Sequence, residues 1–294
     1  MKSSWKYLFG VLVLAAITIW LAVIVSPDNK LHLIACDVGQ GDAILVTYRK
    51  TQILVDGGPD SSVLTCLSEY MPFWDREIEV VILTHPDADH ITGLIEVFKR
   101  YRVKTLVATP LDVSSKGYQV LKSIVGGSGT EVVNPTSGMV IRLGLLYLDI
   151  VYPVSKNLGL TNLSVNNDVL GAFSSNQSPN DFSIVANLRL EEFDALLTGD
   201  IGPKVINDVL ATGKIRDVDY IKIPHHGSKN GLTKELLEAS MPEIAVISVG
   251  KNPWGHPNKE VLELLESYGL DIYRTDQHGN VEVVTDGKKW WLKL

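Results

Sequence analysis

The sequence predicts a mixed α/β protein in which two β-sheets pack back to back with helices outside. Three observations point to this class. Short β-rich runs follow residue 30, and the wholly apolar run Val80–Leu83 is typical of a strand buried on both faces. Strands and helices then alternate, and each half of this part of the chain begins with strands. Periodicity alone does not set the order of the strands. The 294 residues are 45% hydrophobic, which allows a substantial core and excludes a wholly disordered chain.

The expected elements follow from apolar runs that are bounded by turn residues. Strands are expected at Leu31–Cys36, Ala43–Tyr48, Gln52–Val55, Val80–Leu83, Leu106–Ala108, Met139–Leu143, Tyr147–Val151, Phe182–Leu190, Ala195–Leu197, Tyr220–Ile223, Ile244–Ser248, Asp271–Tyr273, Asn280–Thr285 and Lys289–Leu292. Helices are expected at about His90–Tyr101, Lys204–Ala211, Lys234–Ala239 and Lys259–Tyr268. The segment Ser155–Asp181 is rich in Asn and Ser and lacks periodicity, so it predicts a long loop.

An uncharged apolar run extends from Tyr7 to Val25. As a helix it would span roughly 28 Å, close to the hydrocarbon thickness of a bilayer. Lys2 and Lys6 precede it, which favours keeping that end in the cytoplasm. We therefore expect one N-terminal transmembrane helix, a single-pass anchor in the cell membrane through residues 7–25. Residues 1–29 would form a stub and anchor, and residues 30–294 an extracytoplasmic hydrolase domain. A cleaved signal peptide that leaves a secreted protein, or a buried core helix, are the alternatives.

Charge and cysteine content narrow the class of protein. The chain holds 27 basic and 34 acidic residues, a net charge of −7. Residues 1–30 carry +2, so the remainder carries −9, which argues against a broadly basic surface that coats nucleic acid. A nuclease with a locally positive groove remains possible. The two cysteines, Cys36 and Cys66, exclude a Cys-rich zinc module. They could pair in an oxidising compartment, although two buried thiols are the preferred interpretation.

The clearest chemical signal is the segment Thr84–His90, which directly follows an expected buried strand. His85, Asp87, Asp89 and His90 place four potential metal ligands within six residues. Imidazole and carboxylate are natural ligands of zinc and of harder divalent cations. A turn from strand to helix can direct such side chains into one cavity. The alternative is a charged surface loop with an Asp that caps the helix.

Two later strands also end in ligand-type residues. Leu196–Asp200 ends in a carboxylate, and Ile221–Ser228 contains the pair His225 and His226. Open α/β sheets commonly build sites at the carboxyl ends of their strands. Each segment alone could be an ordinary turn or surface loop. Three such clusters together favour a metal site.

These motifs resemble those of a known superfamily. His85-x-Asp87-x-Asp89-His90, Asp200 and His225 match the ordered ligands of the metallo-β-lactamase fold. More closely, the chain resembles the metallohydrolase domain of the ComEC competence family. That resemblance runs from about residue 30 to the C-terminus, and we expect the protein to lack the polytopic channel region of that family. The motifs that carry it are Asp37-Val-Gly-Gln-Gly-Asp42-Ala, Leu54-Val-Asp56-Gly-Gly, Thr84–His90, Leu197-Thr-Gly-Asp200-Ile, Lys222-Ile-Pro-His-His-Gly-Ser228, Gly255-His256-Pro257 and Tyr273-Arg-Thr-Asp-Gln277.

The resemblance implies an αββα sandwich with a site for two divalent cations, Zn²⁺ or Mn²⁺, at one edge between the sheets. Asp200 would bridge the two cations. The remaining implied ligands are His85 and Asp87 for one cation, and Asp89, His90 and His225 for the other.

Two positions depart from the superfamily pattern. Many members have His where Asp87 stands, and a carboxylate there weakens any preference for zinc over manganese. A His expected before the strand that ends at Asp200 is missing, and Asn180 and Asp181 occupy that region. Either Asp181 substitutes as a ligand or the first cation is weakly held. Asp181 as an ordinary turn residue is an equal alternative.

Other polar residues receive supporting roles. Asp56 is expected to orient a metal-binding His, with an ordinary Asp-Gly turn as the alternative. His226 and His256 are candidate phosphate contacts or proton donors, and Asp89 is a candidate catalytic carboxylate as well as a ligand. Lys222 could balance the charge of the carboxylates or contact substrate.

The expected activity is metal-dependent phosphodiester hydrolysis. The resemblance implies a nuclease related to DNA uptake in competence, which would act on DNA outside the cytoplasm. Hydrolysis of a small ester, lactone or phosphocholine-type substrate is an alternative, because no Lys/Arg tract or DNA-binding module is evident. A second alternative is a non-catalytic DNA-binding or assembly subunit with an impaired metal site.

Overall fold

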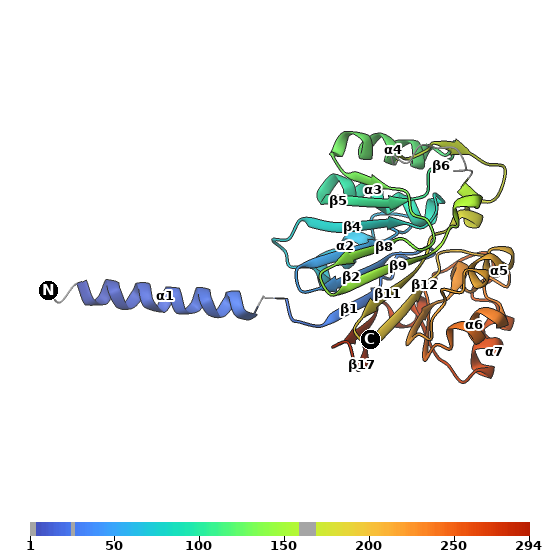
Figure 1. The fold of residues 1–294 in the computed structure, drawn as a ribbon. Helices are drawn as coiled ribbons and strands as arrows, with labels where there is room; N and C mark the ends of the chain where they lie inside the picture. Colours follow the sequence, from blue (N-terminus) through green and yellow to red (C-terminus); the bar gives the residue numbers. More distant parts are fainter. Residues whose placement is uncertain (1–3, 25–26, 159–168) are drawn as a thin grey trace.

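The computed structural model describes residues 4–24, 27–158 and 169–294. Within these residues two large sheets form the centre of the protein (Figure 1). The first sheet has eight strands in the order β17-β16-β1-β2-β3-β4-β5-β7. The second has seven strands in the order β15-β14-β13-β12-β11-β9-β8. Both sheets are mixed, because β3, β4, β5 and β7 run parallel, as do β12 to β15, whereas the other pairs are antiparallel.

The strands coincide closely with the apolar runs of the sequence. Those of the first sheet are β1 (Leu31–Ala35), β2 (Ile44–Tyr48), β3 (Thr51–Val55), β4 (Glu77–Leu83), β5 (Arg102–Ala108), β7 (Glu131–Val133), β16 (Val281–Thr285) and β17 (Trp290–Lys293). Those of the second sheet are β8 (Val140–Leu143), β9 (Leu146–Tyr152), β11 (Val185–Leu190), β12 (Phe193–Leu197), β13 (Tyr220–Lys222), β14 (Ile244–Ile247) and β15 (Asp271–Arg274). A short parallel pair joins β6 (Leu111–Asp112) to β10 (Phe173–Ser174).

Helices pack against the outer face of each sheet. The first sheet is covered by α2 (Val63–Tyr70), α3 (Ala88–Arg100) and α4 (Lys116–Ser128), whose apolar residues share one cluster with its strands. The second sheet is covered in the same way by α5 (Pro203–Ala211), α6 (Lys234–Ser240) and α7 (Lys259–Ser267). The helix α8 (Thr275–His278) follows β15. This arrangement confirms the expected αββα sandwich.

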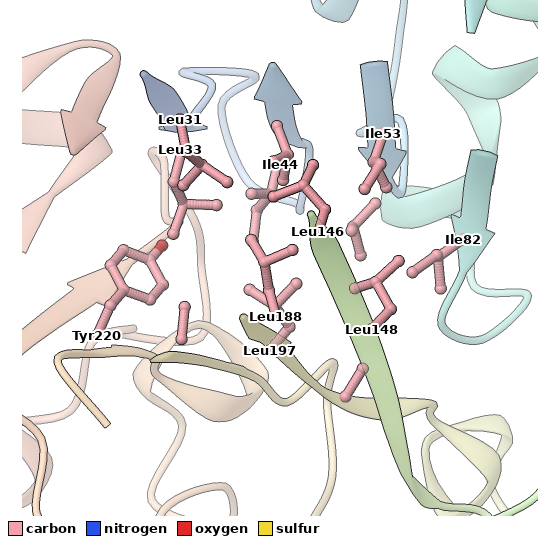
Figure 2. Packing of buried hydrophobic residues seen from close by; sticks show 14 of the residues in the cluster. Leu31, Leu33, Ile44, Ile53, Ile82, Leu146, Leu148, Leu188, Leu197 and Tyr220 are labelled. Carbon is pink, nitrogen blue, oxygen red and sulfur yellow. The ribbon is translucent and has the colours of Figure 1, made fainter. Parts of the chain in front are cut away.

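A separate apolar cluster fills the space between the two sheets (Figure 2). In β3, Ile53 and Val55 belong to this inner cluster, whereas Leu54 belongs to the cluster under the helices. Alternate residues of a strand point to opposite faces, so a strand between two apolar layers needs apolar residues at every position. This explains why the central strands read as continuous apolar runs.

The helix α1 (Ser4–Ile24) precedes the sheets and projects away from them (Figure 1). Across the described residues, none of the helices is both long and apolar enough to cross a membrane. The expected transmembrane helix over residues 7–25 is therefore not supported, and residue 25 lies outside the described residues.

Cys36 and Cys66 form a disulfide, so the preferred interpretation of two buried thiols is wrong. Cys36 follows β1 and Cys66 lies in α2, and both are buried in the cluster between the first sheet and its helices. Their Cα atoms are 5.9 Å apart, which lies within the range that a disulfide requires. The packing of α2 on the sheet brings together two residues separated by 30 positions in the sequence.

The expected long loop at Ser155–Asp181 is largely irregular where it is described. It contains two short 3-10 helices, η1 (Ser155–Leu158) and η3 (Pro179–Phe182), as well as β10. Residues 159–168 of this loop lie outside the described residues. A third 3-10 helix, η4 (Pro224–Gly227), follows β13 and holds both members of the His pair.

Candidate metal centre

Four strands deliver polar residues to one edge of the sandwich. Asp56 follows β3, His85 follows β4, Asp200 follows β12, and Lys222 ends β13. Each of these side chains is buried. Because these strand ends meet between the sheets, residues distant in the sequence lie within a few ångströms of one another. The structure therefore brings together the three ligand-rich segments that the sequence predicts.

The start of α3 lies unusually close to the turn after β3. Gly57 N donates a hydrogen bond to His90 O at 2.7 Å, and Gly93 N donates to Gly58 O at 3.0 Å. A Cβ atom at Gly93 would lie 1.8 Å from Gly57 O, so no larger residue fits without displacing the backbone. This close approach places His90 beside Asp56.

Asp56 organises the segment Thr84–His90. Its carboxylate accepts hydrogen bonds from Thr84 N at 2.8 Å and from Thr84 Oγ1 at 2.6 Å. His90 Nδ1 lies 2.8 Å from the same carboxylate. A carboxylate on Nδ1 leaves Nε2 to point away from it, and it fixes the orientation of the ring. Asp56 thus occupies the orienting position that the sequence predicts.

Asp200 lies at the centre of the site. One of its oxygens, Oδ2, is 3.4 Å from His90 Nε2 and 3.3 Å from His226 Nε2. The backbone places it there through Gly199, which has a φ of +54° and whose Cβ position would lie 3.0 Å from Ser183 Cβ. Asp200 N donates to Ser183 Oγ at 3.2 Å. Ser183 therefore stands beside Asp200 in the region where the superfamily pattern led us to expect a histidine.

His226, rather than His225, faces this carboxylate. His226 Nε2 also lies 3.3 Å from Asp89 Oδ2, and its Nδ1 lies 2.9 Å from the carbonyl oxygen of Ser248. The structure thus gives His226 the position that the resemblance assigned to His225. His225 lies instead beside His256, with ring centroids 5.8 Å apart.

Seven described side chains in this cluster offer ligand atoms close enough to share metal ions. Within the described residues, the convergent sets include His85 with His90 and Asp200, and Asp89 with His90 and His226. The Nε2 atoms of His85, His90 and His226 are all buried and lack a hydrogen-bond partner. Unpaired buried polar atoms are costly unless another partner binds them. Three such nitrogens around carboxylates therefore fit a divalent cation.

Charges within the cluster shift the pKa values of its groups. Burial would lower the pKa of His90, but the carboxylates of Asp200 and Asp56 outweigh burial and raise it well above its usual value. The pKa of His226 is raised in the same way by Asp200 and Asp42. Burial would raise the pKa of Asp200, but His226, Lys222 and His90 hold it well below its usual range. The imidazole protons must leave before these nitrogens can bind a cation.

Three other predicted positions lie outside the convergent sets. Asp87 stands at the N-cap position of α3 with an extended backbone, and its side chain makes no capping hydrogen bond. Its Oδ2 lies 3.5 Å from His85 Nε2. Its side chain is 40% exposed, so it lies at the rim rather than inside the cluster. Asp181 Oδ2 pairs with Lys204 Nζ at 3.1 Å. Asn180 lies beside Asp181 in η3, and the convergent sets of the described residues include neither. Asp181 as a substitute ligand therefore has no support.

Asp42 belongs to the site, although the sequence reasoning gave it no role. Its side chain is buried, and it forms convergent sets with Asp200 and His226 and with Asp56 and His90. Burial would raise its pKa, but Lys222 and then His226 outweigh burial and lower the pKa of Asp42 to about 2. The only sequence signal was its place in the motif Asp37-Val-Gly-Gln-Gly-Asp42-Ala, directly before an apolar strand.

Beyond His225, the rim of the site is aromatic. The ring of His256 lies 6.2 Å from that of Trp254, and Trp254 is 63% exposed. Asn252 holds this loop, since its side chain donates to Gly250 O and His256 O and accepts from the backbone N–H groups of Trp254 and His256. The exposed indole is therefore held on an ordered loop.

Comparison with known proteins agrees with this geometry. A family model described as the metallo-beta-lactamase superfamily matches residues 36–251. ComE operon protein 3 of Bacillus subtilis is 26% identical over 276 residues, which cover 87% of this chain and 33% of that protein. Recombination protein 2 of Haemophilus influenzae is 26% identical over 280 residues, which cover 94% of this chain and 31% of that protein. The chain thus spans about a third of the length of these curated relatives.

A third relative, competence protein ComA of Neisseria gonorrhoeae, is 22% identical over 267 residues, which cover 87% of this chain and 32% of that protein. Together these relatives confirm the resemblance to competence proteins. Among solved structures, the metallo-beta-lactamase fold protein YhfI from Bacillus subtilis aligns with a TM-score of 0.54 and 11% sequence identity. The alignment includes 90% of this chain and 100% of the YhfI chain. That likeness shows the fold alone. The family model spans most of the chain, and the chain belongs to the metallo-β-lactamase superfamily.

Proposed function

We propose that this protein is a metal-dependent phosphodiesterase that cleaves DNA during its uptake, with two divalent cations, Zn²⁺ or Mn²⁺, in the cluster around Asp200. One observation carries this proposal. The Nε2 atoms of His85, His90 and His226 are buried beside the carboxylates of Asp89 and Asp200, and none of them forms a hydrogen bond. When bound, divalent cations would polarise a phosphoryl oxygen and lower the pKa of an attacking water.

The residues of the chain have distinct tasks in such a site. Asp56 and the carbonyl of Ser248 each bind an Nδ1 atom, so they direct the Nε2 atoms of His90 and His226 inward. Asp200 belongs to one convergent set with His85 and His90 and to another with Asp42 and His226, so we assign it the contact with both cations. Asp89 is 34% exposed on its side chain, so it can act on substrate as well as on a cation.

The substrate class rests on two supports. The curated relatives include a competence protein and a recombination protein, and our proposal takes both roles to involve DNA. The rim formed by His256 and Trp254 offers an imidazole for a phosphate or a leaving oxygen and an exposed indole for a base. The whole relatives are about three times longer, so their activities enter here as part of the proposal.

The disulfide supports action outside the cytoplasm. Disulfides form and persist in oxidising compartments and are rare in the cytosol. Cys36 and Cys66 are paired and buried. We expect the two cysteines to resist alkylation in denatured lysate until a reductant is added, because burial no longer protects them there and only the disulfide does. Thiols that react fully in denatured, unreduced lysate would contradict an extracytoplasmic location.

The direct test uses the purified full-length chain. Bound metal is measured after incubation with Zn²⁺ or Mn²⁺, and hydrolysis is then measured with bis-p-nitrophenyl phosphate and with single-stranded and double-stranded DNA. We expect metal binding and cleavage of a phosphodiester, both lost in His226→Ala and both kept in the neighbouring control His225→Ala. Metal binding with cleavage of esters or lactones alone would favour the small-substrate alternative. DNA binding without cleavage would favour a non-catalytic subunit.

A further inference from the structure

A lysine lies inside the metal centre. Lys222 ends β13, and its side chain is 1% exposed. Its Nζ donates hydrogen bonds to Gly199 O at 3.0 Å and to Asp200 Oδ1 at 3.2 Å, and it forms an ion pair with Asp42. An ammonium group has three donors, and here three oxygens accept them. Such full pairing is what allows a charged lysine to remain buried.

The two oxygens of the Asp200 carboxylate contact different partners. Oδ1 is engaged by Lys222, whereas Oδ2 faces His90 Nε2 at 3.4 Å and His226 Nε2 at 3.3 Å. A carboxylate held in this way cannot rotate about its last bond without losing the bond to the ammonium. Asp200 therefore presents a single oxygen to the histidines.

Asp42 holds the lysine in this position from the opposite sheet. Its own backbone is fixed, because Asp42 N donates to Asp89 O at 3.2 Å and Asp42 O accepts from Gly58 N at 2.8 Å. Its other oxygen, Oδ1, lies 3.4 Å from His226 Nδ1. The carboxylate of Asp42 thus contacts Lys222 and His226, and its backbone N–H contacts Asp89. These three parts of the site come from different elements.

We propose that Lys222 and Asp42 are positioning residues that fix Asp200 as a one-oxygen ligand, with the ammonium taking the place of a cation on the other carboxylate oxygen. The three oxygens around Nζ are ligands that a hard cation would use, so the lysine also closes this position to an additional metal ion. The inference rests on the metal-binding part of the proposed function. It does not depend on which substrate is cleaved.

A charge-matched double variant separates positioning from simple electrostatics. Asp42→Asn combined with Lys222→Met removes one negative and one positive charge together, so the net charge of the site is unchanged. The full-length protein is titrated with Mn²⁺ and with Zn²⁺ against a competing chelator. We expect the affinity to fall roughly 10- to 100-fold, the range seen when residues that orient metal ligands are replaced. With a cleavable substrate, kcat should fall while KM stays unchanged.

The control variant makes the same chemical changes outside the site. Asp37 lies in the same loop as Asp42, Lys229 lies shortly after the His pair, and both are exposed. Asp37→Asn combined with Lys229→Met should keep the wild-type metal affinity. Thermal unfolding of every variant in chelator reports whether the fold is intact.

The outcomes distinguish this inference from the proposed function. A folded double variant with wild-type metal affinity would overturn the positioning role, even though the protein binds metal. A wild-type protein that binds no metal would overturn the proposed function and this inference with it. If the double variant does not fold, Asp42→Asn alone provides the test, because its amide oxygen still accepts a hydrogen bond from Lys222. We expect a smaller loss of metal affinity in that variant, and an unchanged affinity would again overturn the inference.

Discussion

His225 and His226 are consecutive residues with nearly the same left-handed backbone, yet their rings lie in different parts of the site. Their φ angles are 51° and 53°, and their ring planes are 78° apart. His226 Nε2 is 3.3 Å from both Asp89 Oδ2 and Asp200 Oδ2. His225 instead faces His256 at the rim. A left-handed conformation is costly for two adjacent residues with side chains, and such strain is typical of functional sites.

His226→Ala should abolish most metal binding, whereas His225→Ala should leave it nearly unchanged. His226 supplies a buried nitrogen to the cluster, and its loss removes a ligand as well as a partner of Asp200. We expect the metal affinity of His226→Ala to fall by more than roughly 100-fold, beyond the effect of replacing an orienting residue. Equilibrium dialysis against Mn²⁺ and Zn²⁺ measures it. The reverse ranking of the two variants would show that His225 is the ligand.

Removing the disulfide should destabilise the fold. Cys36 and Cys66 are 30 positions apart, and the chain-entropy model gives about 3–4 kcal/mol for a closed loop of that length. We expect the double variant Cys36→Ala/Cys66→Ala to unfold roughly 5–10 °C below the wild type. Differential scanning calorimetry measures this with and without dithiothreitol. The reductant should lower the wild-type Tm by a similar amount and leave the variant unchanged, and equal Tm values throughout would contradict a stabilising disulfide.

Asp194 should make the fold less stable as the pH rises. Burial raises the pKa of Asp194 to about 6, against the opposing charges of Arg216 and Arg189. In the unfolded chain the pKa of this carboxyl is lower, near 4. Between pH 4 and pH 6 the folded state therefore holds the proton more tightly than the unfolded state does. The fold loses this stabilisation as the pH rises through about 6. Asp194→Asn removes this loss. We expect the free energy of unfolding of Asp194→Asn to exceed that of the wild type by about 1–2 kcal/mol at pH 7. This figure allows for solvent screening, because the side chain is partly exposed.

The comparison at two pH values isolates this group from the other titrating residues. Urea unfolding of both proteins in chelator should show the gain at pH 7 and none at pH 4. A gain of the same size at both values would mean that the substitution acts through packing rather than through ionisation.

Trp254→Ala should weaken the binding of single-stranded DNA without affecting a substrate that lacks bases. The indole is 63% exposed, on a loop held by Asn252 beside the rim histidines. Stacking of one base on an aromatic ring contributes about 1–3 kcal/mol. We expect KM for a single-stranded oligonucleotide to rise roughly 5- to 100-fold, with bis-p-nitrophenyl phosphate hydrolysis unchanged. The control is Trp74→Ala. Trp74 is 51% exposed and precedes the start of β4, whereas the site lies at the other end of that strand. Equal effects of the two substitutions would contradict a stacking role for Trp254.

Much of the sandwich could be predicted from the sequence because its central strands are buried on both faces. Runs such as Val80–Leu83 leave few alternatives to a strand between two apolar layers. The helices α2 and α4 were not predicted, for physical reasons. In α2 only Val63, Cys66 and Leu67 are buried, and α4 contains three glycines, which weaken its helical pattern.

The site was predicted in its residue types but not in all its contacts. Some site residues stand next to a strand or helix that can be predicted from the sequence, so their positions could be predicted as well. These residues are His85, Asp89, His90 and Asp200. The choice between His225 and His226 depends on two left-handed residues, which no local pattern specifies. The pairing of Asp42 with Lys222 joins the two sheets across 180 positions, and such contacts arise only from the tertiary packing.

The most direct test of the account is the metal content of Asp200→Ala. Asp200 shares one convergent set with His85 and His90 and another with Asp42 and His226, so its removal takes a ligand from both sets. The strand β12 ends before Asp200 and packs through apolar residues, so the fold should survive. Metal content is measured by mass spectrometry on the full-length protein, beside Asp87→Ala, with thermal unfolding as the check of folding. We predict that folded Asp200→Ala retains almost no metal while Asp87→Ala retains part of it. Full metal occupancy in Asp200→Ala would contradict the bridging role of Asp200 and the two-cation site proposed here.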